Sequence, residues 1–373
     1  MWLTTYILID LSSSTIFKPV DLAMFPKKSD GIPESLLSPI QCMPAEIMAE
    51  IFCWSLPNNP NLKVSYPPLL LGRVCSNWRK IALSTPRLWS SLGFESGFIP
   101  SSVTGIETWL TRAGSCPLTL SFAGGKYPSS LFWCLMKFSE RWENVHFCFP
   151  VRSLLCELSA AKGKFSSLRN LELRLFGRWT RVVDAFEVAP QLRSVSLPHR
   201  MYMKPSLFRL PWHQLTKLVV AGITVVEMLG MLRCSPNLME FHITEQDCQD
   251  YPDAYLDIPI VTLNQLQTLN IRYPTQPHNI FERLTLPALR DLTMTRTLHW
   301  PRSEFMTFLS RSSCSLTRLQ VHNSVSSAAQ LIEILDNMPL LVEMDIIDDS
   351  FERDDDLMMR LIYDPDPDDQ KPC

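Results

Sequence analysis

The apolar positions of this chain follow a repeated spacing over its C-terminal two thirds. An apolar residue is followed three and five positions later by two more, and this a-x-x-a-x-a pattern occurs nine times. Its first positions are Trp142, Leu168, Leu192, Leu215, Leu238, Leu266, Leu289, Leu316 and Leu341, with steps of 26, 24, 23, 23, 28, 23, 27 and 25 residues. Because side chains alternate between the two faces of a strand, each occurrence predicts a short strand with one buried face.

Repeats of this length and pattern resemble leucine-rich repeats. Candidate helices follow several strands, at 182–188, 225–233, 304–310 and 328–337. The resemblance implies an α/β (α+β) solenoid of about nine strand–helix units over residues 96–350. The solenoid is expected to be irregular, because the Asn or Cys that regular repeats place after the strand is replaced by Phe176, Arg200, Ile223 and Gln246.

A helical periodicity marks residues 43–92. Ile47 and Ile51 are four residues apart, as are Met48 and Phe52, which predicts an apolar helix face after Pro44. A second helix is predicted from the spacing of Val74, Trp78, Ile81 and Ala82, and a third, begun by Pro86, from Leu88, Trp89 and Leu92. Three short helices make a poor solitary core, so some apolar surface must be covered by the rest of the chain or by another protein.

These residues resemble the F-box, in its fungal F-box-like form. The resemblance rests on Pro44-x-Glu46-Ile47-x-x-x-Ile51-Phe52, Val74-Cys75-x-x-Trp78-Arg79 and Pro86-x-Leu88-Trp89. It implies that a three-helix domain at 41–95 docks on the Skp adaptor, and through it on a cullin ligase. The adaptor-binding residues that it implies are Met43, Pro44, Ile47, Ile51, Val74, Cys75 and Trp78. Met43 replaces the usual leucine, and the longer connection at 57–68 is predicted to be an exposed loop.

The resemblance implies a substrate-recognition subunit of a Skp–cullin–F-box E3 ubiquitin ligase, with the repeat arc binding a target protein. Outward side chains of the predicted strands form a mixed polar face suited to a protein or peptide. The candidate target-binding residues on it are Arg174, Lys217, His242, Arg272, Arg318 and His322. One alternative is a leucine-rich-repeat scaffold unconnected to ubiquitin ligation, whose helices only cap the first repeat. Another is a hydrolase in an unfamiliar fold.

Composition narrows the function classes. The chain has 373 residues, of which 46 % are hydrophobic and 20 % charged, which indicates about two domains with a sizeable core. No apolar run is long enough for a membrane span, and the apolar start of the chain lacks the basic group of a signal peptide. The eleven cysteines include no C-x-x-C pair and the seven histidines are dispersed. We therefore expect reduced thiols, a cytoplasmic and/or nuclear location, and no metal or cofactor.

Residues 1–40 are predicted to be a poorly ordered leader, and 351–373 an acidic cap and tail. Twelve acidic residues lie between Glu343 and Asp369, opposed there by two arginines. The chain has no concentrated basic stripe, phosphate-binding glycine loop, G-x-S-x-G or H-E-x-x-H motif, so we expect neither nucleic-acid binding nor catalysis.

Overall fold

The computed structural model describes residues 40, 43–58, 60–94, 103–123, 129–150, 158–176, 182–197, 207–244, 258–272, 277–295, 301–322 and 335–347. The predicted tail at 351–373 and, except for Ile40, the predicted leader lie outside these residues. The chain divides into two compact units, Met1–Leu192 and Arg193–Cys373. Each unit is described by itself.

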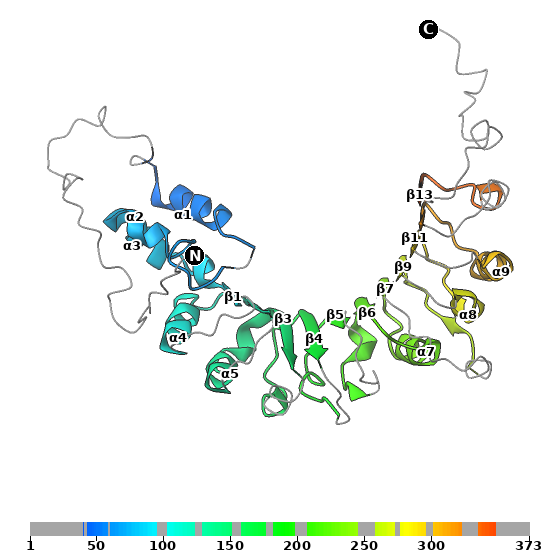
Figure 1. The fold of residues 1–373 in the computed structure, drawn as a ribbon, viewed down its shortest axis with the longest axis horizontal. Helices are drawn as coiled ribbons and strands as arrows, with labels where there is room; N and C mark the ends of the chain where they lie inside the picture. The colour runs from blue at the N-terminus through cyan, green and yellow to red at the C-terminus, as the bar shows by residue number, and fades with distance from the viewer. Residues whose placement is uncertain are drawn as a thin grey trace, which may run out of the picture. The chain divides into compact units, whose positions relative to one another are not determined.

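The first unit joins a group of helices to a parallel sheet (Figure 1). The helices are α1 (Ala45–Trp54), α2 (Leu71–Val74), α3 (Ser76–Leu83) and the 3-10 helix η4 (Pro86–Trp89). The sheet has the order β1-β2-β3-β4, with every pair parallel. Its elements are β1 (Ser91–Phe94), α4 (Val103–Arg112), β2 (Leu118–Phe122), α5 (Ser129–Met136), η5 (Ser139–Arg141), β3 (Trp142–Pro150) and β4 (Asn170–Phe176).

The second unit repeats the same plan. Its strands pair in parallel in the order β5-β6-β7-β9-β11-β12-β13, and Figure 1 shows helices α7, α8 and α9 along one side of them. Their bounds are β5 (Ser194–Leu197), η7 (Trp212–Gln214), β6 (Lys217–Val220), α7 (Val225–Cys234), β7 (Glu240–Ile243), β9 (Thr268–Arg272), α8 (Pro277–Glu282), β11 (Asp291–Thr295), α9 (Arg302–Ser312), β12 (Arg318–His322) and β13 (Glu343–Ile347). A second small sheet pairs β8 (Val261–Thr262) with β10 (Leu284–Thr285).

All nine predicted strands are confirmed. Within strands such as β5, β6 and β7, buried and partly exposed residues alternate, and the apolar positions of the repeat are the buried ones. In-register pairing stacks these side chains on one face, as with Leu218, Phe241 and Leu269. Parallel strands at steps of 23 to 28 residues, with helices in the connections, make a leucine-rich-repeat-like α/β arrangement.

The prediction of about nine units is too small, because the described residues contain two further strands of the repeat, β1 and β2. Trp89-x-x-Leu92-x-Phe94 fits the apolar pattern, but Leu92 was assigned to a helix. In β2 the pattern is hidden because Pro117 takes its first position. β1 also lies inside the range 41–95 predicted for the helical domain.

The predicted helices are partly right. α7 and α9 cover the predictions at 225–233 and 304–310, whereas 182–188 forms turns rather than a helix. Most of 328–337 lies outside the described residues. The second N-terminal helix is broken at Cys75, whose extended backbone separates Val74 in α2 from Trp78 in α3.

The connection at 57–68 is only partly the exposed loop that was predicted, because Lys63 and Tyr66 are exposed but several other residues are not. Pro60, Asn61, Leu62 and Pro68 are buried. The backbone N–H of Gly93 in β1 donates a hydrogen bond to the Pro60 carbonyl at 2.6 Å. The connection therefore packs against the first strand and satisfies a backbone donor of that strand.

Arg141 ties the first repeats together. Its guanidinium donates hydrogen bonds to the carbonyls of Cys116, at 3.0 and 3.1 Å, and of Leu110 at the end of α4, at 3.3 Å. Burial lowers the pKa of this guanidinium. A residue without donors at this position would leave the two carbonyls unsatisfied.

We expect Arg141→Leu to lower the free energy of unfolding by about 2–3 kcal/mol, the usual cost of losing hydrogen bonds to a charged group. Arg169→Leu is the matched control, because Arg169 is exposed and makes one ion pair at 3.5 Å. Thermal unfolding followed by circular dichroism compares the two. Equal melting temperatures for both variants would contradict the assigned role.

Candidate interaction surfaces

Helix α1 carries two apolar stripes, and only one of them is buried. Met48 and Phe52 are each 1 % exposed and pack against the rest of the first unit. Ile47 and Ile51, one position earlier in each turn, are 50 % and 44 % exposed. Both pairs have the four-residue spacing of one helix face, so the two stripes are adjacent. An apolar stripe open to solvent beside a buried one marks a surface able to bind a second protein.

The seven residues implied to bind the adaptor all keep some exposure. Val74 is 44 % exposed and Pro44 is exposed at the start of α1. Met43, Cys75 and Trp78 are partly exposed. Their positions are compatible with the implied role, and whether they contact an adaptor stays a prediction.

Trp78 and Cys75 also stabilise the packing of the N-terminal helices. The Trp78 ring lies 4.9 Å from the ring of Phe52, which joins α3 to the buried stripe of α1. The Cys75 sulfur accepts a hydrogen bond from the backbone N–H of Trp78 at 3.4 Å and so caps α3. Substitution of either residue would disturb the helices as well as any contact surface.

Sequence reasoning missed Trp54, the most exposed large apolar residue of this region at 87 %. It follows Ile51 by three positions and Ile47 by seven, so it extends the same exposed stripe by a turn. This spacing could have predicted that Trp54 belongs to the stripe, but the predicted helix face ended at Phe52.

The helical region is also packed onto the first repeat. Trp89 in η4 is fully buried, and its ring meets that of Trp109 in α4 edge-on at 5.0 Å. Arg112 lies over the Trp89 ring at 4.7 Å, and the Trp89 indole N–H donates to the Ala82 carbonyl at 2.8 Å. The helices therefore cap the repeat through one face while α1 keeps a second apolar stripe exposed.

The six candidate target-binding residues all lie on outward strand positions. Arg174 is on β4 in the first unit; Lys217, His242, Arg272, Arg318 and His322 are on β6, β7, β9 and β12 in the second. Arg174, Arg272 and Arg318 are exposed, and the other three are partly exposed. The predicted alternation is thus correct for each of them, while target binding remains untested.

Most of these basic residues are paired with acids on the same face. The shortest distances are 2.6 Å for Lys217–Glu240, 2.7 Å for Arg318–Glu343 and 3.2 Å for His322–Asp345. The hydrogen bond from Lys217 lowers the pKa of Glu240, and burial lowers the pKa of His242. His242 is therefore mainly neutral at pH 7. The face of the second unit is a mixed polar surface rather than a cationic one.

One row on the first unit resembles the order of a hydrolase triad. In-register pairing places Ser121, His146 and Glu172 side by side, and His146 Nδ1 lies 3.1 Å from Glu172 Oε2. Between these described residues no hydrogen bond joins the serine hydroxyl to the histidine ring. In a catalytic triad that hydrogen bond activates the serine.

Within the described part of the chain, no three His, Cys, Asp or Glu side chains are grouped so as to hold a metal ion. In the same residues, no helix has the length and apolar character needed to cross a membrane.

The cysteine thiols differ in their surroundings. Cys134 in α5 is 3 % exposed, and burial, followed by the nearby Glu107 carboxylate, raises the pKa of its thiol to about 11. Cys234, at the end of α7, is exposed. At pH 8 a thiol with a pKa near 11 is about 0.1 % thiolate, the form that reacts.

We expect iodoacetamide at pH 8 to label Cys234 in the folded protein within minutes and Cys134 at least ten times more slowly. Peptide mass spectrometry of timed samples measures both rates, and a sample unfolded in urea is the control that makes them similar. Equal rates in the folded protein would show that Cys134 is accessible.

Comparison with known proteins adds little to this description. No family model matches the chain, and no curated protein matches it. One similar solved structure is an internalin (InlF) from Listeria monocytogenes strain 4b F2365, with 14 % sequence identity and a TM-score of 0.33. The match covers 72 % of this chain and 84 % of the internalin chain. A likeness at this level carries no argument about function.

Proposed function

We propose that this chain is a non-catalytic substrate receptor of a Skp–cullin–F-box ubiquitin ligase. The helices at 45–89 would dock on the Skp adaptor, and the outward face of the repeat strands would hold a target protein. The receptor would act by proximity, since holding a target beside the charged ubiquitin carrier replaces a bimolecular search with a local one. This role requires no cofactor and fits a cytoplasmic and/or nuclear location.

The observation that carries the proposal is the exposed stripe of α1. Ile47, Ile51 and Trp54 form an exposed apolar stripe beside the buried stripe of Met48 and Phe52, and packing among the described residues does not cover it. Two of the three coincide with positions at which the F-box resemblance implies adaptor contacts. Because about half of each side chain is still exposed, burial of Ile47 and Ile51 by a partner would supply about 0.7–1.5 kcal/mol for each.

The scaffold alternative draws on a different observation. The edge-on contact of Trp89 with Trp109 supports a role of the helices in capping the first repeat. Capping alone, however, requires only the buried residues of η4 and α1. A capping role alone does not account for the exposed stripe of α1, so we prefer the proposal that the chain is a substrate receptor.

Co-expression of the full chain with the Skp adaptor tests the proposal. The two should elute together in size-exclusion chromatography at micromolar concentration. The full chain is used because residues 40–95 alone would lose the contact between Trp89 and Trp109. Separate elution of a folded chain and adaptor would leave the scaffold reading in place.

A further inference from the structure

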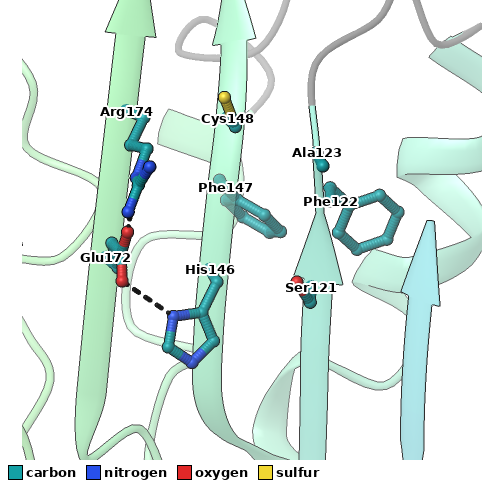
Figure 2. A pocket seen from close by; sticks show the side chains of 8 residues that line it. All are labelled: Ser121, Phe122, Ala123, His146, Phe147, Cys148, Glu172 and Arg174. Carbon is teal, nitrogen blue, oxygen red and sulfur yellow. Dashed lines mark hydrogen bonds and ion pairs between the residues drawn. The ribbon is translucent and has the colours of Figure 1, made fainter. Parts of the chain in front are cut away.

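An open hollow of about 330 Å³ lies on the outward face of the first unit's sheet (Figure 2). Its lining comes from β2, β3 and β4 and from the residue that follows β2. The lining residues are Ser121, Phe122, Ala123, His146, Phe147, Cys148, Glu172 and Arg174. The hollow thus belongs to the face on which the proposed receptor would hold its target.

The hollow results from side-chain size on neighbouring strands. Ser121 on β2 pairs in register with His146 on β3 and Glu172 on β4, and Cys148 pairs with Arg174. Small side chains therefore lie on β2 and long ones on β4. The rings of Phe122 and Phe147 are 2 % and 1 % exposed and point into the core. Figure 2 labels Ser121, Ala123 and Cys148, the small side chains that we call the floor, and Glu172 and Arg174 on β4, which we call the wall.

The size of the hollow limits its occupant. Sites for small molecules usually span about 300–1,000 Å³. A hollow near the lower end of this range, open to solvent, has room for a side chain or two of a bound peptide rather than for a large cofactor.

The charges of the wall largely cancel. Glu172 accepts hydrogen bonds from His146 Nδ1 at 3.1 Å and from Arg174 Nε at 2.6 Å. The bond from His146, with a smaller contribution from Arg174, lowers the pKa of Glu172, so this carboxylate is ionised at pH 7. Its charge offsets that of Arg174, and the floor is uncharged. A phosphate group would therefore gain little net attraction, and a lysine of the target would be repelled by the Arg174 guanidinium.

Two flat groups border the floor in fixed orientations. The same carboxylate holds the His146 ring and the Arg174 guanidinium, so neither has to be ordered when a ligand binds. A guanidinium prefers the face of an aromatic ring, and aromatic rings prefer one another's edges or offset faces. Because His146 Nδ1 donates to the Glu172 carboxylate, Nε2 is the ring nitrogen left to accept a hydrogen bond from a phenol O–H or an indole N–H.

We propose that this hollow binds an aromatic side chain of the target protein, with its ring over the small floor residues and against Arg174 and His146. The proposal deepens the receptor function and rests on it, since the aromatic residue would belong to the recognised target. Aromatic residues seated in pockets are the usual anchors of protein interfaces.

The test uses the full chain labelled with 13C at histidine Cε1 and titrated with N-acetyltyrosinamide. The His146 signal, assigned by its loss in His146→Gln, should shift saturably with a dissociation constant in the millimolar range. N-acetyllysinamide and inorganic phosphate are the comparison probes and should bind at least tenfold more weakly. Saturation by phosphate at lower concentration than by the tyrosine probe would reassign the hollow as an anion site and overturn the proposal, as would no saturable shift.

Two variants separate the hollow from the rest of the face. Ser121→Leu fills the floor and should weaken the tyrosine probe at least tenfold, and Arg174→Gln should weaken it severalfold. Ser196→Leu is the matched control, because Ser196 occupies an outward position on β5 in the other unit. Equal affinities for Ser121→Leu and Ser196→Leu would overturn the assignment. Adaptor binding is measured separately. If the chain binds the tyrosine probe but not the adaptor, the assignment of the hollow stands and the receptor function is contradicted.

Discussion

Replacement of Ile51 by aspartate is expected to weaken binding of the Skp adaptor at least 100-fold, which corresponds to about 2.7 kcal/mol. Ile51 is 44 % exposed at the centre of the stripe formed with Ile47 and Trp54. A carboxylate at this position would have to lose its hydration in an apolar interface without a partner for its charge. The loss therefore combines the apolar burial of isoleucine with the desolvation of aspartate.

Isothermal titration calorimetry, with the adaptor titrated into the full-length chain, measures the dissociation constant. Because Ile51 is exposed in the isolated chain, Ile51→Asp should leave its melting temperature nearly unchanged. Val342→Asp is the matched control, since Val342 is an 87 % exposed apolar residue of the other unit. An unchanged affinity in folded Ile51→Asp protein would remove α1 from the docking surface. An equal loss in Val342→Asp would show that the effect is not local.

The repeat could be predicted because its signal is dense and local. Each strand needs two inward apolar residues two positions apart, and in-register stacking demands the same two in the next repeat. Leu218 and Val220 on β6 meet Phe241 and Ile243 on β7 in this way. The prediction stopped short at β1 because Trp89 has two roles there: it ends η4 and begins the apolar pattern of the strand.

The exposed stripe could be predicted only in part. Ile47 and Met48 head two adjacent apolar stripes with the same spacing, and periodicity cannot say which of them the chain buries. Contact of Phe52 with Trp78 decides it, and that contact depends on where α3 packs. The resemblance supplied the correct exposed pair, whereas Trp54 became evident only from its exposure.

The hollow on β2–β4 lay further from the reach of sequence reasoning. It depends on the relative sizes of Ser121, His146 and Glu172, which are about 25 residues apart in the chain and meet only through strand register. Arg174 was selected as an outward basic residue. Its hydrogen bond to Glu172, whose charge offsets that of Arg174, could be recognised only from the structure.

The largest loss of stability is expected at Trp89, where alanine should cost about 3–5 kcal/mol. Three contacts disappear together: the edge-on pairing with Trp109, the stacking of Arg112 and the hydrogen bond to the Ala82 carbonyl. Arg112 is held in a half-buried place where burial lowers its pKa, so removal of the ring it covers leaves a poorly solvated cation. The cavity lies where the helices meet the first repeat.

Urea denaturation followed by circular dichroism measures this cost, and Trp133→Ala is the matched control because Trp133 is 51 % exposed. Trp133→Ala should cost no more than about 1 kcal/mol, as surface substitutions usually do. Trp89→Phe should fall between the two, since it keeps much of the apolar contact but leaves the Ala82 carbonyl without its donor. A loss for Trp89→Ala no greater than that for Trp133→Ala would show that the helices do not depend on this contact. If the large loss is observed, adaptor binding by Trp89→Ala should weaken only under conditions that unfold the helices, because Trp89 is buried and the α1 stripe is a separate surface.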